Sequence, residues 1–369
     1  MRVPVVLATL AVAGCAAAAN PSPTVLSSGD FPKPLAALMT GARSSQWLAQ
    51  GVDRWEVWVC HVPLETSVAL YGDDQLRLRL SPTSLVDTLN RFVPPYFETL
   101  SHGLYRPEFV AGGEVTMSSA DEPQDCLDRA LEQSTTSSRG VIAIADAEHA
   151  VGEIGGFGTP GAPCSRPPCS AAVTRRAVYV GASDFGADWG ERPPMDLVEH
   201  EMGHALGWPH SAYAPTAAPP YQSAIDLMSN SAAAREADPD RRDGSGTLAL
   251  NRLTAGWLPD DAVVVLASAG GEVELAPSAG TTGRRVAVLA VDDTRFLTVE
   301  VIDASGLDAH LPHSGVAVHR VTFDGTLQSL EPLVGEPPYS DLLEPGDSVS
   351  ADGWTITLLT RWRLRIVPA

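Results

Sequence analysis

Two histidines four positions apart, followed by a third six positions further on, stand near the middle of this chain. They are His200, His204 and His210, in the pattern H-E-x-x-H-x-x-G-x-x-H. Residues four apart on a helix share one face, so the first two imidazoles can bind the same metal ion. Glu201 projects from the same turn and can act on a water molecule there. Gly207 can take a left-handed backbone conformation, which ends the helix and lets the third imidazole return toward the first two.

This donor set predicts a catalytic zinc site. Three neutral imidazoles leave one of the four zinc positions open for water, as catalytic sites require. The alternative is a chance match, because H-E-x-x-H alone is short. Five fixed positions, three of them the rare histidine, occur by accident in on the order of one in ten thousand chains of this length or fewer. Pro193 and Pro194 also suit the start of a helix at this point.

The eleven-residue motif resembles that of the metzincin zinc metallopeptidases. That clan carries a methionine turn beneath the metal, and residues 225–229 (IDLMS) resemble it, with Met228 as the methionine. Some metzincins have a tyrosine ligand two positions later, where this chain has Asn230, so we expect no tyrosine ligand there. The stretch 251–258 (NRLTAGWL) is most similar to gametolysin-like and immune-inhibitor-A-like secreted peptidases. The clan-level resemblance covers about residues 52–260.

The resemblance implies a zinc-dependent endopeptidase acting on protein or peptide substrates, with Glu201 as the general base. One alternative is a cell-surface, zinc-containing binding protein whose peptidase site is vestigial. Against it, all three histidines and Glu201 are present. Another is a zinc hydrolase with a non-peptide substrate. Digestion of casein or gelatin, stopped by a chelator, would decide between the first two readings.

Residues 1–19 are typical of an export signal. Arg2 supplies one positive charge, and residues 3–13 form an apolar run too short to span a bilayer. The run ends V-A-G-C at Cys15, which resembles a bacterial lipobox. We expect a lipid-anchored protein on the outer face of the cell membrane, or a secreted one if cleavage falls among residues 16–19. No other stretch is apolar and long enough to span a membrane, so contact with a membrane is expected only through this anchor.

The remaining cysteines are even in number, as expected of an exported protein with disulfides. Cys164 and Cys169 could close a small loop, and Cys60 would then pair with Cys126. Three pairings are possible, and the spacing alone does not choose among them. A cysteine metal site is the less favoured alternative, because the chain has no C-x-x-C pair.

Hydrophobic periodicity predicts an α+β protein. Residues 20–51 read as a tether and an ordered lead-in. The resemblance implies that residues 52–260 form a metzincin-like catalytic domain, with a mixed twisted sheet, helices and an active-site helix under a cleft. Within it we expect strands at 55–62, 106–117, 140–146 and 177–182 and helices at 81–100 and 121–133.

Residues 261–369 have short β-rich runs between turn signals and predict an all-β, sandwich-like C-terminal domain whose role is open. The expected strands are 263–266, 271–275, 285–291, 296–301, 315–321 and 354–359.

The glycine-rich stretch 151–161 has two readings. It is either a mobile loop, or its 153–157 portion is an edge strand along the cleft. Metzincins hold extended peptides against such an edge by added β-pairing.

Several other polar residues lie outside the zinc motif. We expect His149 to be a solvated loop residue, and His310 and His313 to lie on the surface without a metal. Residues 238–244 (DPDRRDG) are one position out of register for a calcium loop, so we favour a solvent loop, with bound calcium as the alternative.

The net charge of the chain argues against one class of binding partner, nucleic acids. The formal net charge is −20, and a phosphate backbone demands basic patches, so we expect no nucleic-acid partner. We expect a soluble monomer. At 369 residues the chain is long enough for two domains with cores of their own.

Overall fold

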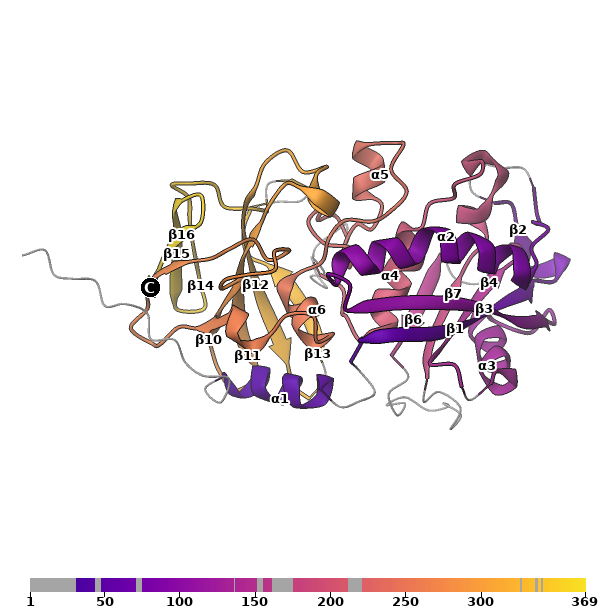
Figure 1. Ribbon diagram of the computed structural model, residues 1–369, viewed down its shortest axis with the longest axis horizontal. Coiled ribbons are helices and arrows are strands. Elements are labelled where there is room, and N and C mark those ends of the chain that lie inside the picture. Colours follow the sequence, from indigo (N-terminus) through magenta and orange to yellow (C-terminus); the bar gives the residue numbers. More distant parts are fainter. Residues whose placement is uncertain are drawn as a thin grey trace, which may run out of the picture.

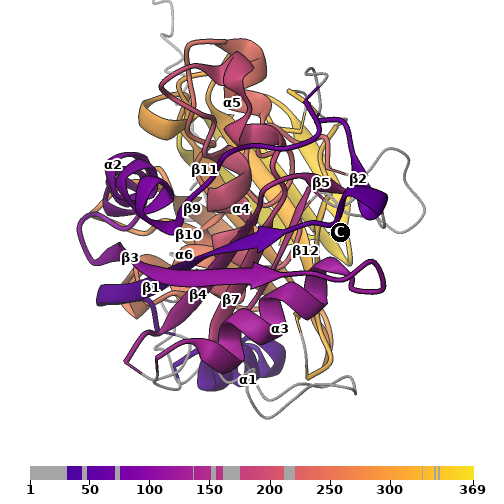
Figure 2. The ribbon, with the colours of Figure 1, turned by 90° about the vertical axis from the view of Figure 1, so that its right-hand side faces the viewer.

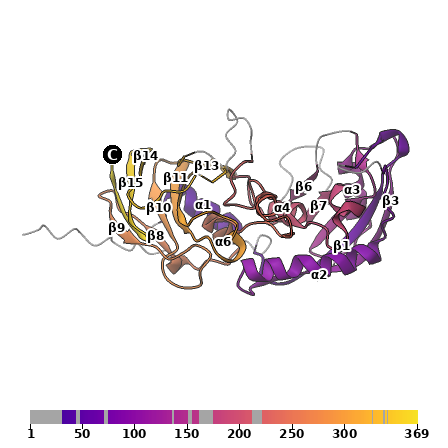
Figure 3. The ribbon, with the colours of Figure 1, turned by 90° about the horizontal axis from the view of Figure 1, so that it is seen from above.

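A computed structural model describes residues 31–43, 48–70, 75–135, 137–150, 155–160, 175–211, 221–325, 327–335, 338–339 and 341–369. Two regions lie side by side along the long axis of the molecule, with helix α4 (Asp196–Ala205) near the middle (Figures 1 and 3). Of the predicted features, Cys15, Cys164, Cys169 and the signal segment lie outside the described residues.

The first region is built on a five-stranded sheet in the order β3-β1-β4-β7-β6. Neighbouring strands are parallel, except that β6 runs antiparallel to β7 at one edge. The strands are β1 (Gly51–His61), β3 (Tyr105–Thr116), β4 (Gly140–Ala145), β6 (Gly156–Thr159) and β7 (Arg176–Val180). The four strands predicted in this region are therefore confirmed with small shifts in their ends. Strand β6 lies at the edge of the sheet and overlaps the last two residues of the edge strand expected at 153–157, whereas residues 153 and 154 lie outside the described residues.

Helices cover both faces of this sheet (Figure 2). Helix α2 (Pro82–Leu100) and α4 pack on one face, and α3 (Pro123–Gln133) packs on the other. Strand β1 shows why: Trp55 and Val57 point into the cluster under α2, while Trp58 points into the cluster under α3. This alternation is the two-residue period of a strand that is buried on both sides.

Helix α2 begins where its sequence predicts. The hydroxyl of Ser81 accepts a hydrogen bond from the backbone N–H of Ser84, and the Ser84 hydroxyl in turn accepts from the N–H of Ser81. Pro82 follows at the first helical position, where its missing N–H costs nothing. A disulfide joins Cys60 at the end of β1 to Cys126 of α3. It is one of the pairings that the sequence left open.

The second region contains a five-stranded sheet, β13-β12-β11-β10-β8, and a four-stranded sheet, β14-β15-β16-β9. Side chains of both sheets share one apolar cluster. The predicted strands are found at β8 (Val263–Val265), β9 (Gly271–Glu274), β10 (Val286–Ala290), β11 (Arg295–Ile302), β12 (Gly315–Phe323) and β15 (Trp354–Thr360). Strands β13 (Leu327–Pro332), β14 (Ser348–Ala351) and β16 (Arg363–Pro368) were not among the predictions.

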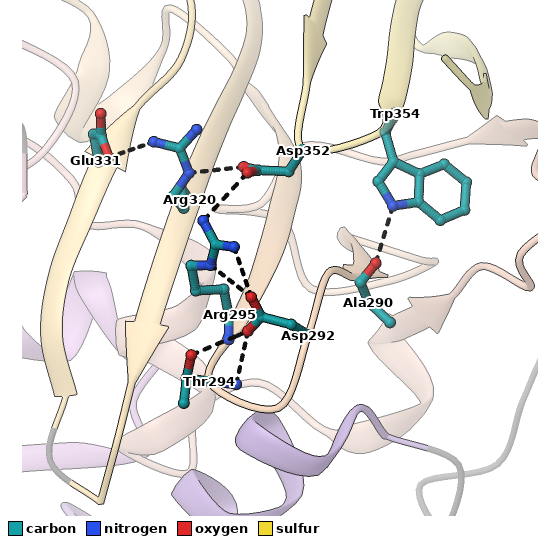
Figure 4. Close-up of polar contacts among 8 residues, drawn as sticks. All are labelled: Ala290, Asp292, Thr294, Arg295, Arg320, Glu331, Asp352 and Trp354. Atoms are coloured by element: carbon teal, nitrogen blue, oxygen red, sulfur yellow. Dashed lines mark hydrogen bonds and ion pairs between the residues drawn. The ribbon is translucent and has the colours of Figure 1, made fainter.

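Polar contacts tie the two sheets together at their turns (Figure 4). Arg320 of β12 donates to Glu331 of β13 at 2.6 Å and to Asp352 at 2.7 Å. Asp352 lies in the two-residue turn between β14 and β15, with φ of 49°. The indole N–H of Trp354 donates to the carbonyl of Ala290 at 3.0 Å. These contacts link the β14–β15 hairpin to the larger sheet.

The start of the described chain returns to the second region. Helix α1 (Lys33–Ala42) packs with α6 (Ala249–Thr254) on the larger sheet, opposite the smaller one (Figure 1). Proline at position 34 stands at the start of α1, and Leu35, Leu38 and Met39 form its buried stripe. Helix α1 lies within residues 20–51, and the sequence analysis did not identify it.

The remaining elements are short. They are strands β2 (Ser67–Val68) and β5 (Glu148–His149), helix α5 (Ala233–Ala237), and 3-10 turns at 64–66, 183–185, 187–189, 260–262 and 306–308. The chain is therefore a mixed α/β protein with several sheets, which is compatible with the expected α+β class. Within the described residues, no helix has the length and apolar character needed to span a bilayer.

Two expectations about isolated histidines were wrong. His149 is buried in β5, and its Nε2 lies 3.0 Å from the carbonyl oxygen of Asp121. His310 is half-buried, with its Nε2 2.8 Å from the carbonyl oxygen of Ala224. In both cases the Nε2 atom contacts a backbone carbonyl that is distant in the chain, and neither contact can be predicted from local sequence.

Candidate metal centre

Helix α4 carries the first two histidines. It begins at Asp196, just after the two prolines, and Asp196 and Glu199 are the acidic residues of its first turn. It ends at Ala205, and Gly207 follows with φ of 89°. This left-handed residue is the exit predicted for it. The backbone N–H of Trp208 then donates to the carbonyl of Gly203 at 3.0 Å, which closes the turn.

The three imidazoles converge. One ligand atom from each of His200, His204 and His210 lies within 4.8 Å of the others. The Nε2 atoms of His204 and His210 are 2.8 Å apart. Within the described residues this is the group of histidine, cysteine or carboxylate side chains that could hold a metal ion. The structure thus brings together the three ligands that the sequence predicts.

Each ring is oriented through its other nitrogen. The Nδ1 of His200 lies 2.7 Å from the carbonyl oxygen of Leu227, and the Nδ1 of His204 lies 2.8 Å from that of Trp208. The Nδ1 of His210 lies 3.5 Å from the hydroxyl of Tyr221. A carbonyl that accepts from Nδ1–H leaves the Nε2 lone pair free for a metal ion. The sequence analysis could not identify these partners, because two of the three are backbone carbonyls.

Burial keeps the imidazoles uncharged. Burial, together with the neighbouring imidazoles, lowers the pKa of His200 and of His210 to about 3. Burial also lowers the pKa of His204, although its contact with the Trp208 carbonyl opposes the shift. Neutral rings at ordinary pH are the form that binds metal.

Glu201 lies beside the cluster with one oxygen unsatisfied. The side chain is 4% exposed, and its buried Oε2 has no hydrogen-bond partner among the described residues. Burial raises its pKa to about 8. A buried carboxylate oxygen without a partner is costly unless a ligand or an ion satisfies it. This orphaned atom is therefore the observation that most favours a bound metal and water here.

A cavity of about 260 Å³ opens over the cluster. Its walls come from β6 on one side and from the metal-binding residues on the other, namely Gly156, Phe157, Gly158, Glu201, His204 and His210. A Cβ added at Gly158 would lie 2.0 Å from the carbonyl oxygen of Glu201. Only glycine lets this edge strand press against α4 so closely.

Met228 lies under the helix turn that bears the ligands. It is fully buried, and a Cβ added at Gly203 would lie 2.5 Å from its sulfur. Met228 therefore packs against α4 at Gly203, the residue that precedes His204. The side-chain amide of Asn230 donates to Glu236 at 2.9 Å. The aromatic hydroxyl near the site comes from Tyr221, which precedes the methionine and has a φ of 63°.

These residues fit a divalent metal ion. Three neutral imidazoles converge, their outer nitrogens are matched with acceptors or a hydroxyl, and a carboxylate stands alongside. The donor set is compatible with zinc, copper, iron or nickel, because imidazole binds all four metals. A three-histidine cluster that could hold a metal ion is what the geometry establishes.

Comparison with known proteins adds little to this picture. No protein-family model matches the chain, and no curated protein matches it. Among solved structures 19 chains match. One, described as "Structure of a chaperone-substrate complex", is 14% identical, with a TM-score of 0.24. The match covers 45% of this chain and 25% of that one, so this chain spans about a quarter of its length. A likeness at this level carries no argument about fold or function.

Proposed function

We propose that this protein is a zinc-dependent endopeptidase of the metzincin type. The single observation that carries the proposal is the convergence of the three imidazoles beside the unsatisfied carboxylate of Glu201. The sequence motif, the left-handed Gly207 and the buried Met228 under the ligands support it. So does a sheet with an antiparallel edge strand beside helix α4, followed by two β-sheets that share one apolar cluster.

Zinc held by His200, His204 and His210 would supply a Lewis acid that lowers the pKa of water and polarises a carbonyl group. Glu201 accepts the proton of the attacking water and then donates it to the leaving amine. Its buried position makes its carboxylate a stronger base than that of an exposed glutamate. No covalent enzyme intermediate is required, and none of the described residues that line the cavity is a serine or a cysteine.

The substrate is an extended peptide in this proposal. Among the described strands, β6 pairs with β7 alone, so its other edge is available for β-pairing with a peptide. The same strand lines the cavity through Gly156 and Gly158. A peptide paired with β6 would therefore pass directly over Glu201, with its carbonyl groups near the imidazoles.

The proposal extends to location. An exported protein, lipid-anchored through Cys15 or secreted, would fold in an oxidising compartment. A disulfide such as Cys60–Cys126 forms and persists there. Mass spectrometry of the mature N-terminus would show a diacylglycerol-modified Cys15, or a cleaved and unmodified chain. An unprocessed N-terminus on protein isolated from its native host would contradict export.

Glu201→Gln tests the mechanism. The amide cannot take up a proton, so we expect hydrolysis of casein or of a mixed peptide library to fall by at least about a hundredfold. Zinc content and the melting temperature should stay close to those of the unchanged protein. The measurements are a fluorogenic peptide assay and metal analysis of the intact protein.

Glu98→Gln is the matched control, because Glu98 forms a surface ion pair with Arg106 on the outer side of α2. It should leave hydrolysis unchanged. A chelator should abolish activity, and added zinc should restore it. Persistence of activity in Glu201→Gln would remove Glu201 from the mechanism, and a protein that holds no zinc would remove the proposal.

A further inference from the structure

A short segment between the methionine turn and α6 is held from both regions of the molecule by buried carboxylates. Residues 244–249 donate three backbone N–H groups to three such side chains. Gly244 donates to Glu199 at 2.7 Å, Gly246 to Asp308 at 2.8 Å and Ala249 to Glu300 at 2.9 Å. Glu199 belongs to α4, whereas Asp308 and Glu300 belong to the second region. This junction segment therefore joins the metal-binding helix to the C-terminal sheets.

One of these contacts continues to the metal centre. The carbonyl oxygen of Gly246 accepts a hydrogen bond from the backbone N–H of Leu227 at 2.8 Å. The carbonyl oxygen of Leu227 lies 2.7 Å from Nδ1 of His200. A continuous series of hydrogen bonds thus runs from Asp308 through Gly246 and Leu227 to a ligand imidazole.

The series is buried along its whole length. Asp308 is 5% exposed, Leu227 is fully buried and His200 is 7% exposed. Because these residues are buried, water cannot replace a lost hydrogen-bond partner. Removal of the Asp308 acceptor would therefore leave the N–H of Gly246 unsatisfied. The backbone there would then shift to find another acceptor.

The contact between Asp308 and Gly246 is also sterically close. A Cβ added at Gly246 would lie 2.7 and 2.8 Å from the two carboxylate oxygens of Asp308. The φ of Gly246 is not in the left-handed region, so its lack of a side chain matters through this contact rather than through its backbone conformation.

A second hydrogen bond also links the turn that contains Asp308 to the methionine turn. His310, two residues after Asp308, places its Nε2 2.8 Å from the carbonyl oxygen of Ala224, at the start of the methionine turn. The turn that begins with the 3-10 helix at Gly306–Asp308 thus contacts the methionine turn directly and through the junction segment.

We propose that Asp308 is a positioning residue for the metal centre, which orients the imidazole of His200 through Gly246 and Leu227. This inference rests on the proposed zinc site and gives the C-terminal region a defined part in it. The second region then completes the metal centre, although it contributes no ligand.

Measurement of zinc affinity tests the positioning role of Asp308 and does not depend on catalytic activity. The variants are Asp308→Ala, which removes the acceptor, and Asp308→Asn, which keeps an acceptor oxygen in nearly the same volume. We expect Asp308→Ala to weaken zinc binding by roughly tenfold, as changes to outer partners of ligands do, and Asp308→Asn to recover most of that loss. Competition with a chromophoric chelator gives the dissociation constant. The d–d absorption of the cobalt-substituted protein reports ligand geometry.

Glu300→Ala is the matched control. Glu300 is also a buried carboxylate of the second region and also accepts from the junction segment, but its partner Ala249 begins α6 and is not part of the series of hydrogen bonds that reaches His200. We expect Glu300→Ala to lower the melting temperature without changing zinc affinity more than about twofold, because it leaves the outer partners of the ligands in place.

Gly246→Ala tests the hydrogen bond between Gly246 and Asp308 by changing the donor residue instead of the acceptor. Its new methyl group should push Asp308 away and weaken zinc binding as Asp308→Ala does, with little further effect when the two changes are combined. This variant keeps the test valid even if Asp308→Ala folds poorly.

The outcomes separate the two proposals. If the unchanged protein binds no zinc, the proposed function fails, and this inference fails with it. If the unchanged protein binds zinc but Asp308→Ala and Glu300→Ala alter its affinity equally, or neither alters it, the positioning role of Asp308 is wrong and the proposed function stands.

Discussion

Histidines in this chain differ in charge state because their surroundings differ. His319 of β12 is fully buried, and burial lowers its pKa to about 4. His61, at the end of β1, has Asp146 2.9 Å and Glu114 3.1 Å from its ring nitrogens. Burial opposes the charged form of His61, but the contacts with the two carboxylates outweigh it and raise the pKa. One residue type therefore gives opposite pH dependence at two positions.

His319→Gln should change how stability depends on acid. Between pH 6.5 and about 4 the unfolded chain binds a proton at His319 and the folded chain does not. The contribution of His319 is therefore complete above pH 6.5 and is lost as the pH falls. We expect the free energy of unfolding of the unchanged protein, relative to His319→Gln, to fall by about 1–3 kcal/mol from pH 7 to pH 4.5. Urea unfolding at the two pH values measures it.

His61→Gln should change the pH dependence of stability in the opposite direction. The folded pKa of His61 is raised, so its stabilising contribution is complete below the unfolded pKa of 6.5 and is lost as pH rises through the folded value. The advantage of the unchanged protein over His61→Gln should therefore shrink from pH 6 to pH 8.5. Equal differences at both pH values, for either variant, would contradict these assignments.

At the scale of elements, the closeness of β6 to α4 shapes the site. Gly156 and Gly158 face the helix, and a Cβ at Gly156 would meet Glu201 Cγ at 2.8 Å. Phe157 points to the other face of the sheet and stacks on Tyr179, with ring centroids 5.3 Å apart. The strand is thus anchored by its aromatic residue and brought to the helix by its glycines.

Gly158→Ala should separate the two elements. The added Cβ would meet the backbone oxygen of Glu201 at 2.0 Å, and backbone atoms of a buried helix cannot yield as a side chain can. We expect a loss of about 1–3 kcal/mol in unfolding free energy, typical of overpacking, and a fall in peptide hydrolysis. Guanidinium unfolding and the peptide assay measure the two effects.

Gly41→Ala is the control, because a Cβ there meets nothing within 4 Å and Gly41 lies inside helix α1. It should stabilise the protein by about 0.5–1 kcal/mol and leave hydrolysis unchanged. A Gly158→Ala variant as stable and active as the unchanged protein would show that β6 does not lie against α4.

At the scale of the whole molecule, the two regions are joined at several places. Helix α1 packs on the C-terminal sheet, and the indole of Trp257 donates to the carbonyl of Ala49, just before β1. The hydroxyl of Tyr96 on α2 donates to Ser245 in the junction segment at 2.7 Å. Loss of order in one region would therefore remove partners from the other.

Unfolding should consequently be a single transition that zinc shifts as a whole. Free zinc at a hundred times its dissociation constant should stabilise the folded chain by about 2.7 kcal/mol. Scanning calorimetry with zinc and with a chelator tests this. Two separate transitions, of which zinc moves only one, would show that the regions unfold independently.

The sequence determined those features whose causes are local. Four such features depend on near neighbours in the chain, and each was predicted. They are the spacing of His200 and His204, the left-handed glycine that leads to His210, the capping of α2 at Ser81 and the two-residue alternation of β1. Short strands such as β14 and β16, and helix α1, were missed because their apolar patterns are brief or lie beside proline and glycine, and packing against distant partners stabilises them.

Only the tertiary structure decided what surrounds the ligands. The carbonyl of Leu227 and the hydroxyl of Tyr221 contact ligand imidazoles from outside the motif, and the carboxylate of Asp308 contacts Gly246 from 62 residues away. No pattern marks them, because a backbone carbonyl is present at every residue, and a buried aspartate looks like any other in sequence. Folding selects these groups by position, since a buried N–H must find an acceptor wherever the packed chain provides one.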